Sequence, residues 1–177
     1  ENGVIFGDEI NLVEPGFNSG WNKIDGIWLR GYPIEDTEDH VATNQTKDLL
    51  VDFNGKGKYS SPEFTWFNDV GPTAIKFFNS DKLGNRYQDD IFVGDIMNGN
   101  IYHFELNKER TELLLPINNS LSDKVVSSNE TYDEIIFGEG FGGITDIEVG
   151  PGDGYLYILT FNERQGTIYR ITTNGSI

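Results

Sequence analysis

Hydrophobic and polar residues alternate along residues 100–106, which puts Tyr102 on one face of an extended segment and His103 on the other. Another run of β-branched and aromatic residues occupies positions 90–95. The pair Asn98-Gly99 lies between the two runs and is typical of a two-residue turn. The pattern therefore predicts a β-hairpin.

The same design returns later in the chain. Residues 154–160 and 166–172 are also rich in β-branched and aromatic side chains, with a polar loop from 162 to 165 between them. Gly99-Asn-Ile-Tyr and Gly166-Thr-Ile-Tyr match closely and start 67 positions apart. Each hairpin also follows a further strand-like run: residues 71–78 before the first and residues 144–150 before the second. The sequence thus repeats a sheet of at least three strands.

Repeated small antiparallel sheets are the units of a β-propeller, in which each sheet buries its faces against its neighbours. We therefore predict an all-β fold made of about two to three blades of a propeller. The repeat is longer than a usual blade of about 40 to 50 residues, so an insertion is expected, and the polar residues 107–133 are the candidate. A β-sandwich is the alternative, although its strands rarely repeat one hairpin so closely.

Composition narrows the possible functions. The 177 residues carry 13 Lys and Arg against 29 Asp and Glu, a formal charge of −16, which argues against a nucleic-acid partner. No apolar run approaches the roughly 18 residues that a membrane span needs. The chain has no Cys, which excludes disulfides, thiolate metal sites and cysteine nucleophiles.

The sequence gives little evidence for common catalytic or nucleotide-binding motifs. A Gly-x-Ser-x-Gly hydrolase motif does not occur. Residues 138–143 satisfy Gly-x-Gly-x-x-Gly, but the next residues alternate as a strand and offer no helix N-terminus to a pyrophosphate, so a dinucleotide site is rejected. His103, beside Glu105, is expected to have a structural or surface role, and His40 ends an acidic stretch that we interpret as a solvated loop.

Three motifs, in the same order along the chain, resemble signatures of the soluble quinoprotein glucose/sorbosone dehydrogenases. They are Asp8-Glu-Ile-Asn-Leu-Val13 with Pro15-Gly-Phe-Asn-Ser-Gly-Trp21, Phe92-Val-Gly-Asp with Gly99-Asn-Ile-Tyr, and Thr145-Asp-Ile-Glu-Val-Gly-Pro with Asp153-Gly-Tyr-Leu-Tyr-Ile-Leu-Thr160. Members of this family are six-bladed propellers that use pyrroloquinoline quinone and calcium to oxidise aldose sugars.

The resemblance implies that residues 1–177 form the C-terminal part of a longer propeller, with the catalytic His upstream and no general base among these residues. It also implies a periplasmic or extracellular location and a sugar substrate. Two to three blades cannot close a ring, so open blade edges are expected to cause self-association.

For the quinone, the resemblance implies that Gly3 and Val4 offer backbone carbonyls to its calcium and that Trp66 lies beside the cofactor. A loop leading into a strand is the alternative for Gly3 and Val4, and a core aromatic is the alternative for Trp66.

For a structural calcium, the resemblance implies ligands from Glu9, from carbonyls near Ser19 and Asp25, and from a later acidic residue, for which Glu63 is the candidate. Calcium takes six to eight oxygen ligands, which carboxylates and exposed carbonyls supply together. A solvated acidic turn is the alternative for Glu9.

The quinone pocket departs from the family pattern. Met97 stands where these enzymes tend to carry a Lys, and Gly143 and Thr145 replace basic residues that hold the cofactor carboxylates. Buried carboxylates need cations or several hydrogen-bond donors. Two hypotheses follow. In the first, the chain is part of a quinone-dependent aldose dehydrogenase. In the second, it is part of a calcium-stabilised propeller that serves as a binding or adhesion module.

Overall fold

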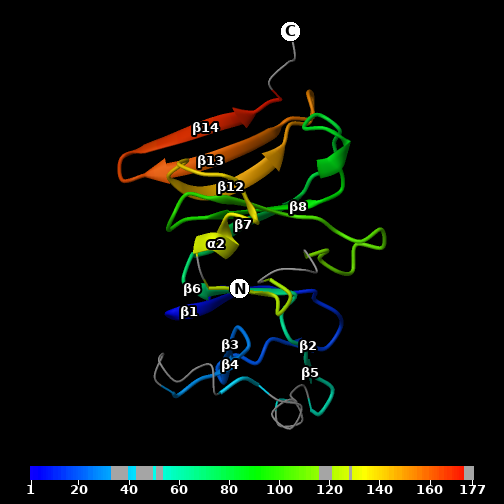
Figure 1. The fold of residues 1–177 in the computed structure, drawn as a ribbon, viewed down its shortest axis with the longest axis vertical. Coiled ribbons are helices and arrows are strands. Elements are labelled where there is room, and N and C mark those ends of the chain that lie inside the picture. The colour runs from blue at the N-terminus through cyan, green and yellow to red at the C-terminus, as the bar shows by residue number, and fades with distance from the viewer. Residues whose placement is uncertain (33–39, 43–49, 51–53, 116–120, 128, 174–177) are drawn as a thin grey trace. The chain divides into compact units, whose positions relative to one another are not determined.

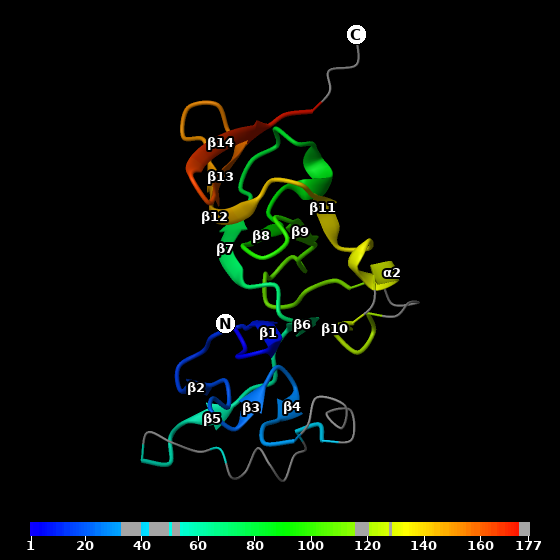
Figure 2. The ribbon, with the colours of Figure 1, turned by 90° about the vertical axis from the view of Figure 1, so that its left-hand side faces the viewer.

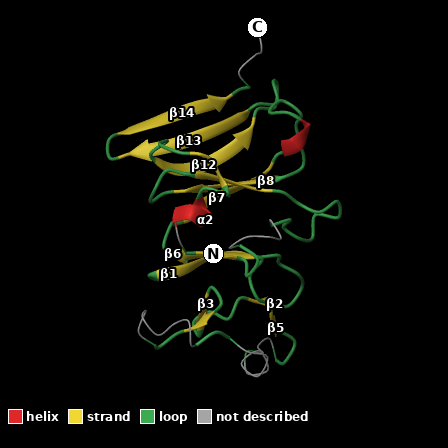
Figure 3. Cartoon of the chain, in the orientation of Figure 1, coloured by secondary structure: helices red, strands yellow, loops and turns green. Residues whose placement is uncertain are grey.

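The computed structural model describes residues 1–32, 40–42, 50, 54–115, 121–127 and 129–173. The chain divides into two compact units, one made of Glu1–Asp69 and Asp123–Ser127 and the other of Val70–Ser122 and Ser128–Ile177 (Figure 1). Strands and loops account for almost all of the described residues, with a short 3-10 turn η2 (Asn85–Tyr87) and a single helical turn α2 (Asn129–Tyr132) (Figure 3). Among the described helices, none is long and apolar enough to cross a membrane.

The second unit contains a four-stranded antiparallel sheet in which the predicted hairpin is confirmed. Its strands, in spatial order, are β7 (Pro72–Phe77), β8 (Ile91–Asp95), β9 (Ile101–Phe104) and β11 (Ile136–Gly138), as Figure 2 shows. At the turn between β8 and β9, Gly99 has a φ of 69°. A Cβ at that position would lie 2.5 Å from the Gly142 carbonyl oxygen, so the turn requires glycine.

A three-stranded antiparallel sheet follows, also as predicted. It consists of β12 (Gly143–Val149), β13 (Leu156–Asn162) and β14 (Gln165–Ile171). The pairing of β13 with β14 is unbroken from Leu156↔Ile171 to Asn162↔Gln165, so the turn is tighter than the expected four-residue loop.

The two sheets of this unit share one core. Phe92 and Ile101 from the first sheet pack with Ile144 and Ile158 from the second, and all four are essentially inaccessible to solvent. A Cβ on Gly94 would lie 2.5 Å from Ile144 Cγ2, which shows how closely the sheets approach. β7, β8 and β9 follow one another along the chain, as do β12, β13 and β14, and the two sheets exchange no strand, as in propeller blades and unlike a Greek-key sandwich.

The insertion predicted at 107–133 is only partly a loop. Leu113 bridges back to Leu106, and Leu121 is fully buried. Within it, β10 (Val125–Val126) pairs in parallel with β6 (Phe64–Asn68) of the first unit. The prediction missed β10 because a two-residue strand with a distant partner has no local periodicity.

The first unit is built on β1 (Phe6–Ile10), which pairs antiparallel with β6. Its described residues also form two small ribbons: β2 (Phe17–Asn18) with β5 (Lys58–Tyr59), and β3 (Ile24–Asp25) with β4 (Trp28–Leu29). Phe6, Trp28 and Phe67 pack ring against ring at centroid distances of 5.2–6.2 Å. Gly7 lets β1 pass close to β3, since a Cβ there would lie 2.7 Å from the Asp25 carbonyl carbon.

Candidate functional site

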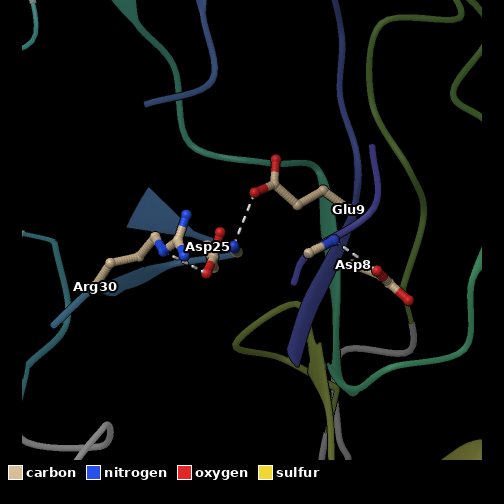
Figure 4. Close-up of polar contacts among 6 residues, drawn as sticks. Asp8, Glu9, Asp25 and Arg30 are labelled. Carbon is tan, nitrogen blue, oxygen red and sulfur yellow. Dashed lines mark hydrogen bonds and ion pairs between the residues drawn. The ribbon is translucent and has the colours of Figure 1, made fainter. Parts of the chain in front are cut away.

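Two adjacent acidic residues of β1, Asp8 and Glu9, point away from each other because successive strand side chains alternate in direction (Figure 4). The Glu9 side chain is directed toward the Asp25–Gly26 segment. Its Oε1 accepts a hydrogen bond from the Gly26 amide at 2.8 Å, and its Oε2 accepts one from Asn11 Nδ2 at 2.8 Å. Only 4% of Glu9 is exposed, so β1 delivers a carboxylate into the interior of the unit.

Burial changes the ionisation of Glu9. Loss of hydration raises the pKa of its carboxyl group to about 7, although the hydrogen bonds from Asn11 and Gly26 favour the charged form. The neighbouring Glu1 carboxylate adds to the increase. Near neutral pH the group is thus poised between its protonated and ionised forms, and a bound cation would hold it ionised.

Asp25, at the end of β3, is the second buried carboxylate of this region, with 3% of the residue exposed. Burial raises the pKa of Asp25 despite its ion pair with Arg30, whose Nε lies 3.1 Å from Asp25 Oδ2 (Figure 4). Glu1 also raises the Asp25 pKa. We refer to Glu9 and Asp25 together as the buried carboxylate pair.

Ser19 and Glu63, the other two predicted calcium ligands, each contact a different charged residue. The Ser19 hydroxyl donates to Glu1 Oε1 at 3.0 Å, which links Ser19 to a third carboxylate near the buried carboxylate pair. Glu63 accepts a hydrogen bond from Lys124 Nζ at 3.0 Å, an ion pair within the first unit. Among the residues that the structure describes, no three His, Cys, Asp or Glu side chains form a metal-binding group. A cation here would therefore need backbone carbonyls as well.

Gly3 and Val4 form a loop that precedes β1. The Gly3 amide donates to Asp8 Oδ1 at 2.7 Å, and a Cβ on Gly3 would lie 1.9 Å from the Phe6 carbonyl oxygen. The loop is thus held back against β1 and tolerates only glycine at its first position. Half of Val4 is exposed, so the segment lies at the surface.

Trp66, from β6, is fully buried. Its ring packs edge-on against Phe64 with centroids 5.0 Å apart. This packing corresponds to the core role that the sequence left open for Trp66 beside the cofactor role.

Met97 and Gly143 lie at the same edge of the second unit. Gly143 begins β12, and a Cβ on it would lie 3.1 Å from Ile96, the neighbour of Met97. Met97 is 64% exposed, and Thr145 is exposed as well. The sequence contains no Lys or Arg from 125 to 163 or from 88 to 107, so neither segment supplies a cation to this edge.

Both histidines have local partners. His103 Nε2 lies 2.8 Å from Asp90 Oδ2, and the ring also contacts Tyr87 and Phe92. His103 is half-buried, and its face of β9 is covered by these aromatic side chains. His40 stacks on Tyr32 at 3.5 Å between ring centroids, while residues 35–39 of the acidic stretch lie outside the described residues.

The sequence did not predict the contacts of three residues of this region, which are Asp8, Asn11 and Arg30. The alternation of side chains along residues 6–10 could have separated Asp8 from Glu9, since one strand cannot aim both at one ion. Asn11 and Arg30 had no local signal, because their roles depend on contacts that only folding creates.

Comparison with known proteins decides the family. The family model described as Glucose / Sorbosone dehydrogenase matches residues 1–170. The chain belongs to the glucose/sorbosone dehydrogenase family. The curated relatives include the aldose sugar dehydrogenase YliI of Escherichia coli K12, 27% identical over 173 residues, and the protein slr1608 of Synechocystis, 26% identical over 171 residues.

The chain spans about a third of these relatives. The alignments cover 97% of the chain but 37% of YliI and 32% of slr1608. Solved structures show the same relation. A glucose dehydrogenase aligns with a TM-score of 0.60 at 22% identity, covering 98% of this chain and 40% of that one. The apo form of the soluble E. coli aldose sugar dehydrogenase aligns with a TM-score of 0.58 at 23% identity, covering 96% and 39%. These likenesses confirm the fold of a partial β-propeller.

Proposed function

We propose that this chain is part of a quinone-dependent aldose dehydrogenase of the glucose/sorbosone family and that its first unit binds a structural calcium ion at the buried carboxylate pair. The observation that carries the proposal is Glu9, a buried carboxylate whose pKa is raised to about 7, next to the segment of the buried Asp25. Family membership over residues 1–170 supports the sugar dehydrogenase class.

The donor set fits calcium. Glu9 and Asp25 supply hard anionic oxygens, and carbonyls near Ser19 and Asp25 would complete the six to eight ligands that the ion takes. A cation would offset the desolvation of both carboxylates, a cost that Arg30 now reduces at Asp25 alone. Glu63 Oε2 is paired with Lys124, whose positive charge disfavours a calcium ion beside it.

The residues present do not fit pyrroloquinoline quinone. A quinone carboxylate would meet Met97, Gly143 and Thr145 at the edge where family enzymes carry cations, and Trp66 is buried in packing. Gly3 and Val4 can offer carbonyls from a surface loop, which any residue types can do. We therefore assign no oxidation step to these residues and propose that the redox chemistry depends on parts of the protein outside them.

The wider setting follows from the family. We propose that residues 1–177 correspond to the C-terminal portion of a larger propeller that acts on an aldose in the periplasm or outside the cell. The alignments support this reading, because nearly the whole chain matches a third of each relative.

Calcium titration tests the site. After chelator treatment, isothermal titration calorimetry is expected to detect calcium uptake by the wild type and a loss of at least about tenfold in affinity for Glu9→Gln, which removes the anionic oxygen. Glu14→Gln, a change at an exposed carboxylate of the same unit, is the matched control and should bind as the wild type does. Absence of uptake by the wild type would remove the calcium proposal.

The second candidate is a calcium-stabilised propeller that serves as a binding module. The exposed Met97 and the missing cations at Gly143 and Thr145 favour it. A dye-linked aldose oxidation assay with added quinone and calcium, on the protein as the cell makes it, separates the two. Sugar oxidation supports the dehydrogenase, and calcium uptake without quinone binding supports the module.

A further inference from the structure

An open hollow of about 880 Å³ lies on the second unit. One wall is the second half of β7 and the chain that follows it, and the opposite wall is the turn from β12 to β13. The lining residues are Ile75, Lys76, Phe77, Asn79, Ser80, Lys82, Arg110 and 149–154.

The hollow lies at the far end of the strands from Met97. Pro72 at the start of β7 pairs with Asp95, and the Ile96 amide donates to the Gly71 carbonyl at 3.0 Å. The turn between β8 and β9 that contains Met97, here called the Met97 turn, therefore lies next to the first residue of β7. Phe77 is five residues further along, or about 17 Å in an extended strand. Likewise, β12 starts at Gly143 beside the Met97 turn and ends at Val149 in the hollow. The hollow is therefore separate from the edge expected for the quinone.

Cations gather in the hollow although the chain as a whole is strongly acidic. Lys76, Lys82 and Arg110 line it, with Asp153 as the one carboxylate among its lining residues. The Asp153 oxygens are already used by the Tyr157 hydroxyl at 2.7 Å and by the Tyr155 amide at 3.2 Å.

The three cations differ in their ion pairs with carboxylates. Lys76 pairs with Glu148 at 2.6 Å and Arg110 pairs with Asp89, both at the surface, where an ion pair contributes little and can be exchanged for a ligand. Within the described part of the chain, no carboxylate forms an ion pair with Lys82. Its stem lies against Gly154, where a Cβ would be 3.1 Å from Lys82 Cγ. Of the three cations, Lys82 is therefore the one whose charge no described carboxylate neutralises in an ion pair.

The backbone of β7 adds donors and acceptors. β7 is an edge strand of its sheet in the described structure. The Phe78 amide bonds to the Asp90 carbonyl at 2.8 Å, and the register continues through Lys76↔Phe92 and Ala74↔Gly94. Because bonded and non-bonded pairs alternate in an antiparallel ladder, the N–H and C=O groups of Ile75 and Phe77 point away from β8, along the edge that borders the hollow.

We propose that this hollow binds a small polyhydroxylated carboxylate, such as a sugar acid. The carboxylate is held by Lys82 and Arg110 through charge-assisted hydrogen bonds. The hydroxyl groups pair with the outward N–H and C=O groups of Ile75 and Phe77, which an anion without hydroxyls cannot satisfy. The exposed side chains of these two residues, 56% and 47% accessible, offer an apolar surface to the C–H face of the ligand. The proposal does not depend on calcium, the quinone or any oxidation by this protein.

Calorimetry and amide NMR with gluconate as the probe test the proposal on the whole chain. Gluconate is expected to shift the amide signals of residues 75–82 and 150–154. Lys82→Gln and Arg110→Gln are each expected to weaken binding about tenfold, because each removes a hydrogen bond to a charged group. Lys108→Gln, at an exposed cation outside the hollow, is the matched control and should leave the affinity unchanged.

Two further probes define the ligand class. Neutral glucose and inorganic phosphate are each expected to bind at least about tenfold more weakly than gluconate, since glucose lacks the charge and phosphate lacks the hydroxyl groups. The proposal is overturned by no gluconate binding, by equal effects of Lys82→Gln and Lys108→Gln, by shifts centred on Met97, or by phosphate or glucose binding as tightly as gluconate. Far-UV circular dichroism of each variant confirms that its fold is intact.

Discussion

At the scale of one residue, burial of the Glu9 carboxylate makes the stability of the fold depend on pH. In the folded protein its pKa is about 7, against a reference value of 4.5. Between these values the folded state binds more protons than the unfolded state, so stability falls as pH rises. The loss is complete above pH 7 and is about 3 kcal/mol for a shift of this size.

A substitution isolates this effect. With calcium chelated, Glu9→Gln keeps the shape of the side chain and removes the titration, so it should raise the free energy of unfolding by up to about 3 kcal/mol at pH 8 and change it little at pH 4. Urea denaturation at the two pH values measures the difference. A variant with the same pH dependence as the wild type would show that Glu9 is not the titrating group.

The stability contribution of Asp25 also falls as pH rises, because burial raises its pKa too, but the ion pair with Arg30 opposes this increase.

The buried carboxylate pair could be predicted only in part. The Asp8-Glu9 motif identified Glu9 through a family resemblance, whereas the depth of its burial depends on Gly7, which brings β1 against β3.

At the scale of one element, the turn between β8 and β9 is fixed by Asp95 as well as by glycine. Asp95 is fully buried, and its Oδ1 accepts hydrogen bonds from the Asn98 amide at 2.6 Å and the Gly99 amide at 2.8 Å. Its Oδ2 accepts one from the Tyr102 hydroxyl at 2.6 Å. One carboxylate therefore ties the end of β8 to the turn and to β9.

Removal of this carboxylate should be costly. Asp95→Ala removes the acceptor of three hydrogen bonds, two of them from the buried Gly99 amide and Tyr102 hydroxyl, and is expected to lower the free energy of unfolding by about 3 kcal/mol or more. Tyr102→Phe, which removes only the Tyr102 bond from this set, should cost about 1–2 kcal/mol. Asp81→Ala, at an exposed position of the same unit, should stay within about 0.5 kcal/mol of the wild type. Urea denaturation followed by circular dichroism gives the three values. An Asp95→Ala protein as stable as the control would contradict this role.

At the scale of the whole molecule, the open edge of the last sheet stands out. By the internal repeat, β14 corresponds to β9, and β9 has β11 as its outer partner whereas the described part of the chain places no strand beyond β14. Leu159 and Ile168 pair across β13 and β14, so they share a face, and Ile168 is 69% exposed. An unpaired edge with an exposed apolar face favours pairing with another chain.

We therefore expect self-association of the chain at tens of micromolar. Ile168→Lys places a charge at the edge strand and should reduce the mass measured by light scattering to that of the monomer, 19.9 kDa. Val13→Lys changes an exposed apolar residue of the first unit, 70% accessible, and should leave the association intact. A monomeric wild type at this concentration, or equal dissociation of both variants, would contradict the prediction.

The sequence by itself determined the hairpins and their repetition, because turn chemistry at Asn98-Gly99 and side-chain alternation along 100–106 act between near neighbours. It also carried the family motifs, and with them Glu9. Only the tertiary structure decided the parallel pairing of β10 with β6, the approach of Glu9 to the Asp25–Gly26 segment, and the meeting of β7 with the 149–154 turn around Lys82. These features join residues 17 to about 75 positions apart, and contacts at such separations depend on how whole strands pack, for which no local pattern in the chain exists.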